Sequence, residues 1–342
     1  MGNMEARPGW TRFAIATTVF LSLLCMAPGI ASAQAPVKVR ILYTPAFTGH
    51  LPVLIAADAG FFGRNGISAE LTGSSEPIKP LLSGDVDFAL PAPAVAAVAA
   101  VQGAGVKIIL SVQKRITQAL LVQPELAKTL KSAPGSYPAV VKELAGKKIG
   151  VSVRGGSVDI NLRYLLIAAG LTPDKDVFVV PLGGGGPMVA GMKGKQVDGI
   201  LGFPPLTNQL VADGVAVKII DLAKGDGPKA LDQPFVVAAV LTRYLEQNEG
   251  TVRRFVTAMV QTMDFIKDPK NKAELTRITS ARLSGMSPAV IDTVIPELAA
   301  TMDPKFTRDD LVRVNEVQRA LGVLSRDVRP EEVMSDKFQT DK

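Results

Sequence analysis

The sequence predicts an α/β protein built from two similar lobes, and three observations carry this prediction. Short apolar strands alternate with helices from residue 37 onward, which is typical of a parallel sheet with helices on its faces. The same alternation begins again near residue 148. A short pattern also recurs 111 residues later in the chain: Val86-Asp87, Leu90 and Pro93 return as Val197-Asp198, Leu201 and Pro204.

The first lobe is expected to contain four strands with helices between them. Residues 37–43 alternate apolar and polar side chains, as a half-buried strand does. Residues 51–59 are an apolar helical segment, and Gly60 is a suitable stop for it. The other elements expected here are strands at 67–71, 86–90 and 106–112 and helices at 76–82 and 93–102.

The second lobe is expected to repeat this order. Two further apolar strands, 119–122 and 235–242, lie where the chain would cross between the lobes. Residues 246–326 indicate helices, and Met259 and Met263 have the spacing of core residues rather than of a binding stripe. The elements of the repeat are strands at 148–153, 177–181 and 197–201 and helices at 157–169 and 187–192.

The composition is globular and argues against several kinds of site. The chain has 342 residues, 47% of them apolar and 20% charged, which suits two domains. It has one His and one Cys, whereas zinc sites, disulfide frameworks and His-dependent nucleophilic catalysis need several such residues. We therefore expect no metal, no cofactor and no catalytic residue. The net charge of +6 is dispersed, so we expect no nucleic-acid partner.

The N-terminus has the three parts of a secretory signal peptide. Arg7 and Arg12 form the positive region, residues 13–26 are apolar or small, and residues 31–33 read Ala-Ser-Ala. The apolar run is shorter than the about 20 residues that a membrane-spanning helix needs. We expect residues 1–33 to be cleaved after Ala33 and the mature protein to be periplasmic. An uncleaved N-terminal anchor is the alternative.

Four short segments of the chain share the motifs of one protein family. They are residues 51–62 (LPVLIAADAGFF, followed by Gly66 and Ser74-Ser75), 83–88 (SGDVDF), 143–150 (ELAGKKIG) and 244–255 (YLEQNEGTVRRF). In these segments the chain resembles the periplasmic substrate-binding proteins of ABC importers, in the nitrate, sulfonate, taurine and thiamine-precursor group. The segments occur in the family's order.

The resemblance implies a type II periplasmic binding protein, with a hinge of two crossover strands and a ligand cleft between the lobes. The first lobe would comprise residues 34–118 and 243–342, and the second would comprise residues 119–242, crossover strands included. The resemblance also implies a monomer that delivers a small solute to a permease and its ATPase in the inner membrane.

Candidate ligand-binding residues of the first lobe lie where predicted strands end. A desolvated polar solute needs many directed donors, and helix N-termini supply them. His50 would contact the ligand or cap a helix, and Ser74 and Ser75 would bind the ligand or act as N-caps. The glutamate would pair with a ligand amine or with its own helix dipole. Small residues at the third helix would admit the ligand or serve packing. These candidates are Phe47, His50, Ser74, Ser75, Glu76, Ala92, Pro93 and Ala94.

The second lobe offers a corresponding set. Arg154 would bind a sulfonate, carboxylate or phosphate of the ligand through two hydrogen bonds, or would pair with a carboxylate at the protein surface. The glycines and the serine would leave backbone amides accessible, or would form flexible turns. The phenylalanine would stack on the ligand or pack between the lobes. These candidates are Arg154, Gly155, Gly156, Ser157, Gly184, Phe203 and Pro204.

The leading functional hypothesis is therefore a periplasmic solute receptor of an ABC importer. Arg154 and the helix N-termini favour an anionic organic solute of the sulfonate or carboxylate type. A receptor for a pyrimidine-type thiamine precursor is the alternative within the family. A pyrimidine-synthesising enzyme of the same frame is disfavoured by the secretion signal and by a mature chain without Cys. A sensory or scaffold protein of the same two-lobed frame is a third hypothesis, which would need a fused signalling domain or a dedicated partner; no fused domain is visible in the sequence.

Overall fold

The computed structural model describes residues 1–2, 35–45, 47–74, 76–335 and 337–338. The chain divides into two compact units, Met1–Ala35 and Pro36–Lys342. The proposed cleavage site and nearly all of the predicted signal peptide lie outside the described residues, as does Ser75. The fold described below is that of the unit Pro36–Lys342.

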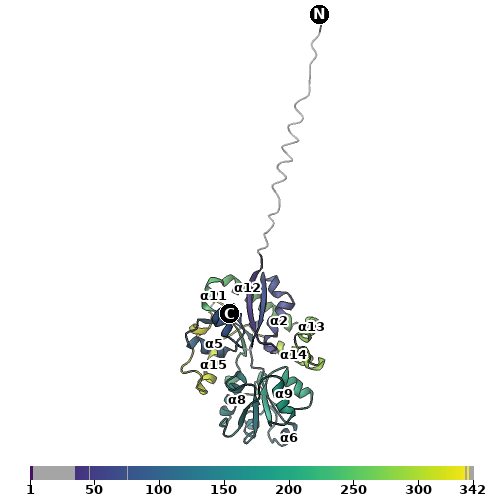
Figure 1. The fold of residues 1–342 in the computed structure, drawn as a ribbon, viewed down its shortest axis with the longest axis vertical. Coiled ribbons are helices and arrows are strands. Elements are labelled where there is room, and N and C mark those ends of the chain that lie inside the picture. Colours follow the sequence, from purple (N-terminus) through teal and green to yellow (C-terminus); the bar gives the residue numbers. More distant parts are fainter. Residues whose placement is uncertain (3–34, 46, 75, 336, 339–342) are drawn as a thin grey trace. The chain divides into compact units, whose positions relative to one another are not determined.

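Two five-stranded sheets form the centre of this unit (Figure 1). The first has the strand order β2-β1-β3-β10-β4 and the second the order β7-β6-β8-β5-β9, so the two sheets have the same pattern. In each sheet three neighbouring strands are parallel and the fourth is antiparallel. The strands of the first sheet are β1 (Val37–Tyr43), β2 (Ile67–Gly73), β3 (Phe88–Ala89), β4 (Val106–Gln113) and β10 (Val236–Leu241). Those of the second are β5 (Ala119–Val122), β6 (Lys148–Val151), β7 (Phe178–Pro181), β8 (Gly199–Gly202) and β9 (Val217–Asp221).

Helices cover both sheets, and Figure 1 shows α2, α5, α11 and α12 beside the first sheet and α6, α8 and α9 beside the second. In the first half of the chain the helices are α2 (Leu51–Asp58), α3 (Phe61–Arg64), α4 (Lys79–Ser83), α5 (Pro93–Val101), α6 (Pro124–Ala127), α7 (Ala139–Lys142) and α8 (Ser157–Ala168). In the second half they are α9 (Gly186–Lys193), α10 (Leu206–Ala212), α11 (Thr242–Gln247), α12 (Glu249–Lys267), α13 (Lys272–Arg282), α14 (Pro288–Ala300), α15 (Arg308–Ala320) and α16 (Pro330–Val333). Short 3₁₀ turns are η1 (Thr48–His50), η2 (Leu222–Lys224), η3 (Lys229–Leu231) and η4 (Pro269–Asn271).

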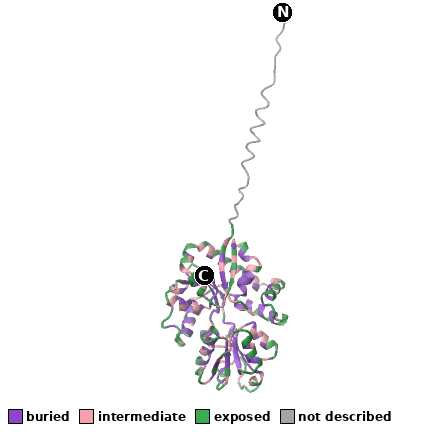
Figure 2. Cartoon of the chain, in the orientation of Figure 1, coloured by how far each residue is buried: buried purple, intermediate pink, exposed green. Residues whose placement is uncertain are grey.

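The core lies on both faces of each sheet, since buried residues concentrate in the strands (Figure 2). In β5, Leu120 and Val122 join one apolar cluster, whereas Ala119 and Leu121 join another. This alternation is the two-residue period of a strand that is covered on both faces. On α12 the helical period buries Met259 and Met263, which confirms that they are core residues.

The internal repeat reflects one structural role that occurs in both sheets. Asp87 precedes β3, and its Oδ2 accepts a hydrogen bond of 2.8 Å from the backbone N–H of Arg40 in β1. Asp198 precedes β8, and its Oδ2 accepts a bond of 2.8 Å from the N–H of Lys148 in β6. Each aspartate therefore ties its strand to the neighbouring parallel strand at the same place in the sheet.

The chain passes between the sheets twice, through residues 114–118 and 222–235. The strands expected to cross, 119–122 and 235–242, instead lie within the sheets as β5 and β10, and the connections are the segments next to them. The second lobe was expected to end at residue 242, whereas β10 pairs with β3 and β4 of the first sheet. The change of lobe therefore comes before Val236, because the backbone hydrogen bonds of this strand are made within the first sheet.

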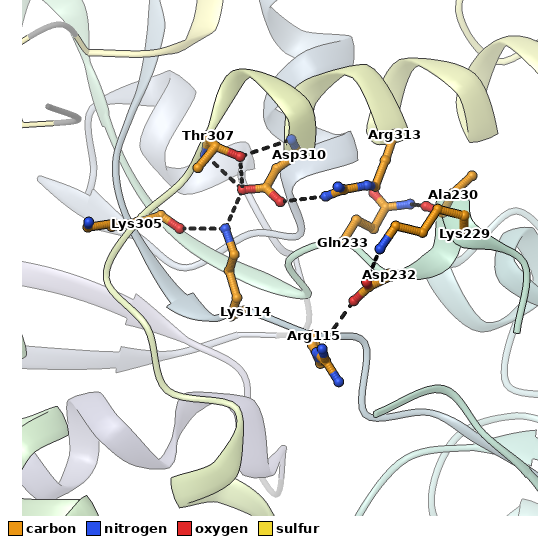
Figure 3. A network of polar contacts seen from close by, with 10 residues as sticks. All are labelled: Lys114, Arg115, Lys229, Ala230, Asp232, Gln233, Lys305, Thr307, Asp310 and Arg313. Carbon is orange, nitrogen blue, oxygen red and sulfur yellow. Dashed lines mark hydrogen bonds and ion pairs between the residues drawn. The ribbon is translucent and has the colours of Figure 1, made fainter. Parts of the chain in front are cut away.

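The C-terminal helices contact elements of both lobes. Helix α14 contacts α13 and also α10, and α15 contacts α5 and also α8 and η3. Figure 3 shows how α15 meets both crossings. The Lys114 ammonium of the first crossing bonds to Asp310 in the first turn of α15. Arg115, also in the first crossing, pairs with Asp232 of the second at 3.4 Å.

No helix among the described residues is long and apolar enough to cross a membrane.

Candidate functional site

A cavity of about 1100 Å³ is lined by residues of both lobes and of both crossings. Binding sites for drug-sized molecules usually have volumes of about 300–1,000 Å³, so this cavity can hold an organic molecule far larger than nitrate. Most of its wall is apolar. The crossings contribute Ile116, Gln233 and Phe235, which places the cavity at the point where the chain passes from one sheet to the other.

Four helices begin at the cavity wall, because each follows a strand that ends there. The N-cap residues of α5, α8, α9 and α10 are Ala92, Gly156, Gly185 and Pro205, and all four line the cavity. None of them makes a side-chain capping bond. Free first-turn N–H groups can therefore donate to a ligand acceptor.

Several features reduce how strongly these helix ends attract an anion. Pro93 and Pro187 occupy the first turns of α5 and α9 and have no N–H. In the first turn of α8, the Oδ2 atom of Asp159 already accepts a bond of 2.8 Å from the N–H of Gly155. The carboxylate is also paired with Arg163 at 2.8 Å, so its effect at this helix end is to occupy the Gly155 N–H rather than to add a free negative charge.

An aromatic cluster joins the two lobes at the cavity. The Phe47 ring lies edge-on to His50, Phe203 and Phe235, at centroid distances of 4.9, 5.0 and 5.4 Å. Beside it, the Thr48 hydroxyl donates to the Pro204 carbonyl oxygen of the other lobe at 3.0 Å. Phe203 thus packs between the lobes and also lines the cavity, and stacking of its ring on a ligand stays a prediction.

His50 is held by the backbone through both ring nitrogens. Nδ1 accepts from the Thr44 N–H at 2.6 Å, and Nε2 lies 2.8 Å from the Leu90 carbonyl oxygen. These partners require a proton on Nε2 and none on Nδ1. Burial lowers the pKa of His50 to about 4, although the two backbone bonds act in the opposite direction. The ring presents its apolar surface to the cavity, and neither nitrogen is available to donate to a ligand.

Arg154 belongs to a surface network rather than to the cavity lining. Its Nη1 lies 3.1 Å from Asp174 Oδ2, and its Nη2 donates to the Val179 carbonyl oxygen at 3.2 Å. Asp174 is shared with Arg163, which also bonds to Asp159. The alternative of a surface ion pair therefore describes this arginine, and the predicted anion clamp has no geometric support.

Ten of the predicted site residues line the cavity: Phe47, His50, Ala92, Pro93, Ala94, Gly155, Gly156, Ser157, Gly184 and Phe203. Contact of these ten with a ligand stays a prediction. The lining does not include Ser74, Glu76, Arg154 and Pro204.

The helix that follows β2 begins later than the sequence predicts. Ser74 is not its N-cap, because α4 starts only at Lys79. The Ser74 hydroxyl instead accepts from the N–H of Glu76 within a turn, at 3.0 Å. Exposed Glu76 lies outside the first turn of α4, so it neither reaches the cavity nor meets that helix dipole.

Three buried residues with amide side chains line the cavity but were not predicted from the sequence: Asn161, Gln233 and Gln318. Asn161 follows Ser157 by one helical turn, so helical spacing could have pointed to it. Gln233 and Gln318 come from the second crossing and from α15, and no local signal marks them. Among the described lining residues Lys193 is the one charged side chain, and it pairs with Asp213 at 3.1 Å. No group of three or more His, Cys, Asp or Glu within the described part could hold a metal ion.

Comparison with known proteins gives this geometry a context. The NMT1-like family matches residues 32–280, which is well over half of the chain. The chain belongs to this family. The NMT1-like match ends before α15, so Gln318 lies beyond it.

The relatives of this NMT1-like chain are named as binding proteins. The nitrate/nitrite binding protein NrtA of Nostoc sp. is 32% identical over 158 residues, which are 46% of this chain and 34% of the relative. The alignment therefore spans about a third of that relative's length.

Solved structures show that the fold is shared. The aliphatic sulphonate binding protein SsuA of Escherichia coli superposes with a TM-score of 0.72 at 15% identity, covering 90% of this chain and 95% of that one. The nitrate-binding protein NrtA of Synechocystis PCC 6803 superposes with a TM-score of 0.67 at 17% identity, covering 89% and 87%. The family resemblance and the two-lobed periplasmic binding protein fold are thereby confirmed.

Proposed function

We propose that this chain is the periplasmic solute-binding component of an ABC importer. The observation that carries the proposal is the cavity of about 1100 Å³, which is lined by both lobes and by both crossings. A solute in this position bonds to both lobes at once, so it favours their closed arrangement. The names of the relatives support the same role.

Binding rather than chemistry fits the residues of the cavity. Acid–base catalysis needs a titratable group with a free atom near the substrate. Both nitrogens of His50 are engaged by the backbone, and Lys193 is paired with Asp213. We therefore propose a receptor that presents its closed form to a permease and its ATPase, and that acts as a monomer.

The solute of this receptor is an organic molecule that offers hydrogen-bond acceptors to the helix N-termini. The expectation of a sulfonate or carboxylate rested mainly on Arg154, which is engaged with Asp174 outside the lining. A pyrimidine-type thiamine precursor is small enough for the cavity and belongs among the compounds to be tested.

A thermal-shift screen of residues 34–342 tests the proposed function. The panel contains nitrate, taurine, alkyl and aryl sulfonates, aromatic carboxylates, pyrimidines and riboflavin. A ligand at about 100 times its Kd adds roughly 2.7 kcal/mol of stability, which is a rise of several degrees at roughly 2–4 °C per kcal/mol. The shift should persist in Arg154→Ala and be reduced in Ser157→Trp, where the indole would occupy part of the cavity. A shift of equal size in Ser157→Trp would contradict binding beside the start of α8.

Export is the second part of the proposal. N-terminal sequencing of the protein from a periplasmic extract should begin at Gln34, directly after the predicted cleavage site. An intact Met1 on protein that sediments with membranes would contradict it.

A further inference from the structure

Gln318 presents a polar group to the cavity that the fold leaves unbonded. It lies on α15, is only 3% exposed and lines the cavity. Its side-chain amide makes no hydrogen bond to any residue that the structure describes. The amide faces the open cavity, where water can reach it, and a ligand that enters the cavity can take the place of that water.

In two further amide side chains of the lining, the nitrogen donates a hydrogen bond within the fold but the carbonyl oxygen accepts none from the described residues. Asn161 Nδ2 donates to Gln118 Oε1 at 2.9 Å, and Gln233 Nε2 donates to the Ala230 carbonyl oxygen at 2.8 Å. The carbonyl oxygens of Asn161 and Gln233 have no partner within the described part of the chain. All three amides are uncharged and come from α8, the second crossing and α15, so they surround the cavity from different elements.

The remainder of the wall suits an apolar, flat molecule without a charge. Phe47, Phe203 and Phe235 form one aromatic surface. An ion moved into such a cavity loses its hydration, and in this cavity no free side chain of opposite charge lies in the described lining to offset the loss. The donors missing at Pro93 and Pro187 and the Gly155 N–H that Asp159 occupies reduce the number of N–H groups that an anion could bond to.

We propose that the cavity binds an uncharged aromatic solute and that Gln318 is a specificity-determining residue that hydrogen-bonds its polar group. The proposal rests on the proposed function and deepens it. Residue 318 lies beyond the family match at residues 32–280. The C-terminal helix α15 thus adds a recognition group to a cavity whose other walls lie mainly within the family's shared region.

Two dyes that differ by one sulfonate test the charge of the ligand. N-phenyl-1-naphthylamine is uncharged, whereas 8-anilino-1-naphthalenesulfonate is its sulfonated analogue, and both fluoresce more strongly in apolar surroundings. The uncharged dye should bind to residues 34–342 at least tenfold more tightly than the sulfonated one. The Ser157→Trp variant, whose indole would occupy part of the cavity, should weaken this binding. Equal or tighter binding of the sulfonated dye would overturn the ligand class.

Displacement of the uncharged dye tests Gln318. In Gln318→Met, which keeps the length of the side chain, 2-naphthamide should displace the dye at least tenfold less effectively. Naphthalene, which has no hydrogen-bonding group, should compete unchanged. The melting temperature without ligand should stay equal or rise, because the amide has no partner in the fold. The matched control Gln196→Met alters an exposed glutamine outside the cavity and should change neither competitor.

The outcomes separate this proposal from the proposed function. Unchanged displacement by 2-naphthamide would overturn the role of Gln318, and so would a lower melting temperature together with weaker displacement by both competitors. If neither dye binds, the ligand class is wrong, whereas a cavity-dependent shift with any compound of the thermal-shift panel would still support a solute receptor.

Discussion

Both ring nitrogens of His50 are bonded to backbone atoms, and this decides what the side chain does. The N–H of Thr44 and the carbonyl oxygen of Leu90 belong to the ends of two strands at the cavity wall. The imidazole therefore joins these strand ends in its neutral form. A proton on Nδ1 would remove the acceptor that Thr44 needs, and burial makes that charge costly.

The first prediction concerns this single histidine. Its pKa of about 4 in the folded chain lies below the ordinary 6.5, so the unfolded state takes up the proton first as the pH falls. Its contribution to stability is complete above pH 6.5 and is lost between pH 6.5 and about 4, by roughly 3 kcal/mol. One imidazole resonance in an NMR titration reports this pKa directly. Urea unfolding of His50→Gln, whose amide can keep both bonds, should lack the loss in this window. An imidazole that titrates near 6.5 would contradict the assignment.

At the scale of one element, the start of α15 is held by a buried carboxylate (Figure 3). Asp310 is 1% exposed and accepts bonds from the Thr307 N–H at 2.7 Å, from the Thr307 hydroxyl at 2.8 Å and from Arg313 at 3.1 Å. The Lys114 ammonium, which also donates to the Lys305 carbonyl oxygen at 3.0 Å, completes the set. This one residue therefore caps the helix and attaches it to the first crossing.

The second prediction is that Asp310→Asn lowers the free energy of unfolding by about 3 kcal/mol. The change breaks a buried ion pair, which typically costs about 3–5 kcal/mol when one partner is removed, while the retained amide oxygen preserves part of the cap. Urea unfolding at neutral pH measures the difference. Asp309→Asn is the matched control, because this neighbour in the same helical turn is exposed, and it should change stability by less than about 0.5 kcal/mol. Equal effects of the two variants would show that burial of Asp310 is unimportant.

At the scale of the whole fold, helix α14 connects the lobes in addition to the crossings. Asn208 of α10 donates to the Thr293 hydroxyl and to Glu297 of α14, each at 2.9 Å. Thr48 and Pro204 make a second connection beside the cavity. Opening of the cleft would break these bonds, so they favour the arrangement in which the cavity is enclosed.

The third prediction is that Asn208→Ala weakens solute binding without loss of folding. Removal of both bonds, taken together as worth about 1 kcal/mol, lowers a small binding-competent fraction by about fivefold, and the measured Kd rises by the same factor. Calorimetry with the compound found in the screen measures this change. Asn65→Ala removes bonds made to Phe61 and Gln261, neither of which lies in the second lobe, and serves as the control with an unchanged Kd. An equal loss of affinity in the control would contradict a role for the connection between the lobes.

The elements that the sequence predicted most accurately are those whose apolar periodicity and bounding turn residues can both be recognised in the local sequence. Residues 119–122 match β5, and α12 (Glu249–Lys267) lies within residues 246–326, where helices were expected. Gly60 has a φ of 76°, a conformation that glycine adopts without strain, and it ends the segment of α2 as predicted. Among the elements that were not predicted, α3, α6 and α7 are single turns of four residues, which carry too short a pattern to recognise, and α10 and β9 follow the proline pair Pro204-Pro205.

By itself the sequence determined the α/β class, the repeated lobe and the family, because periodicity and turn residues act over a few neighbours. It also located ten lining residues, since parallel strands bring the starts of their helices to the same edge of a sheet. Only the tertiary structure decided which side chains face the cavity. Arg154 is turned away by Asp174, twenty residues later in the chain. Gln318 reaches the cavity from a helix far along the sequence. Such pairings depend on contacts between distant segments, and local spacing carries no information about them.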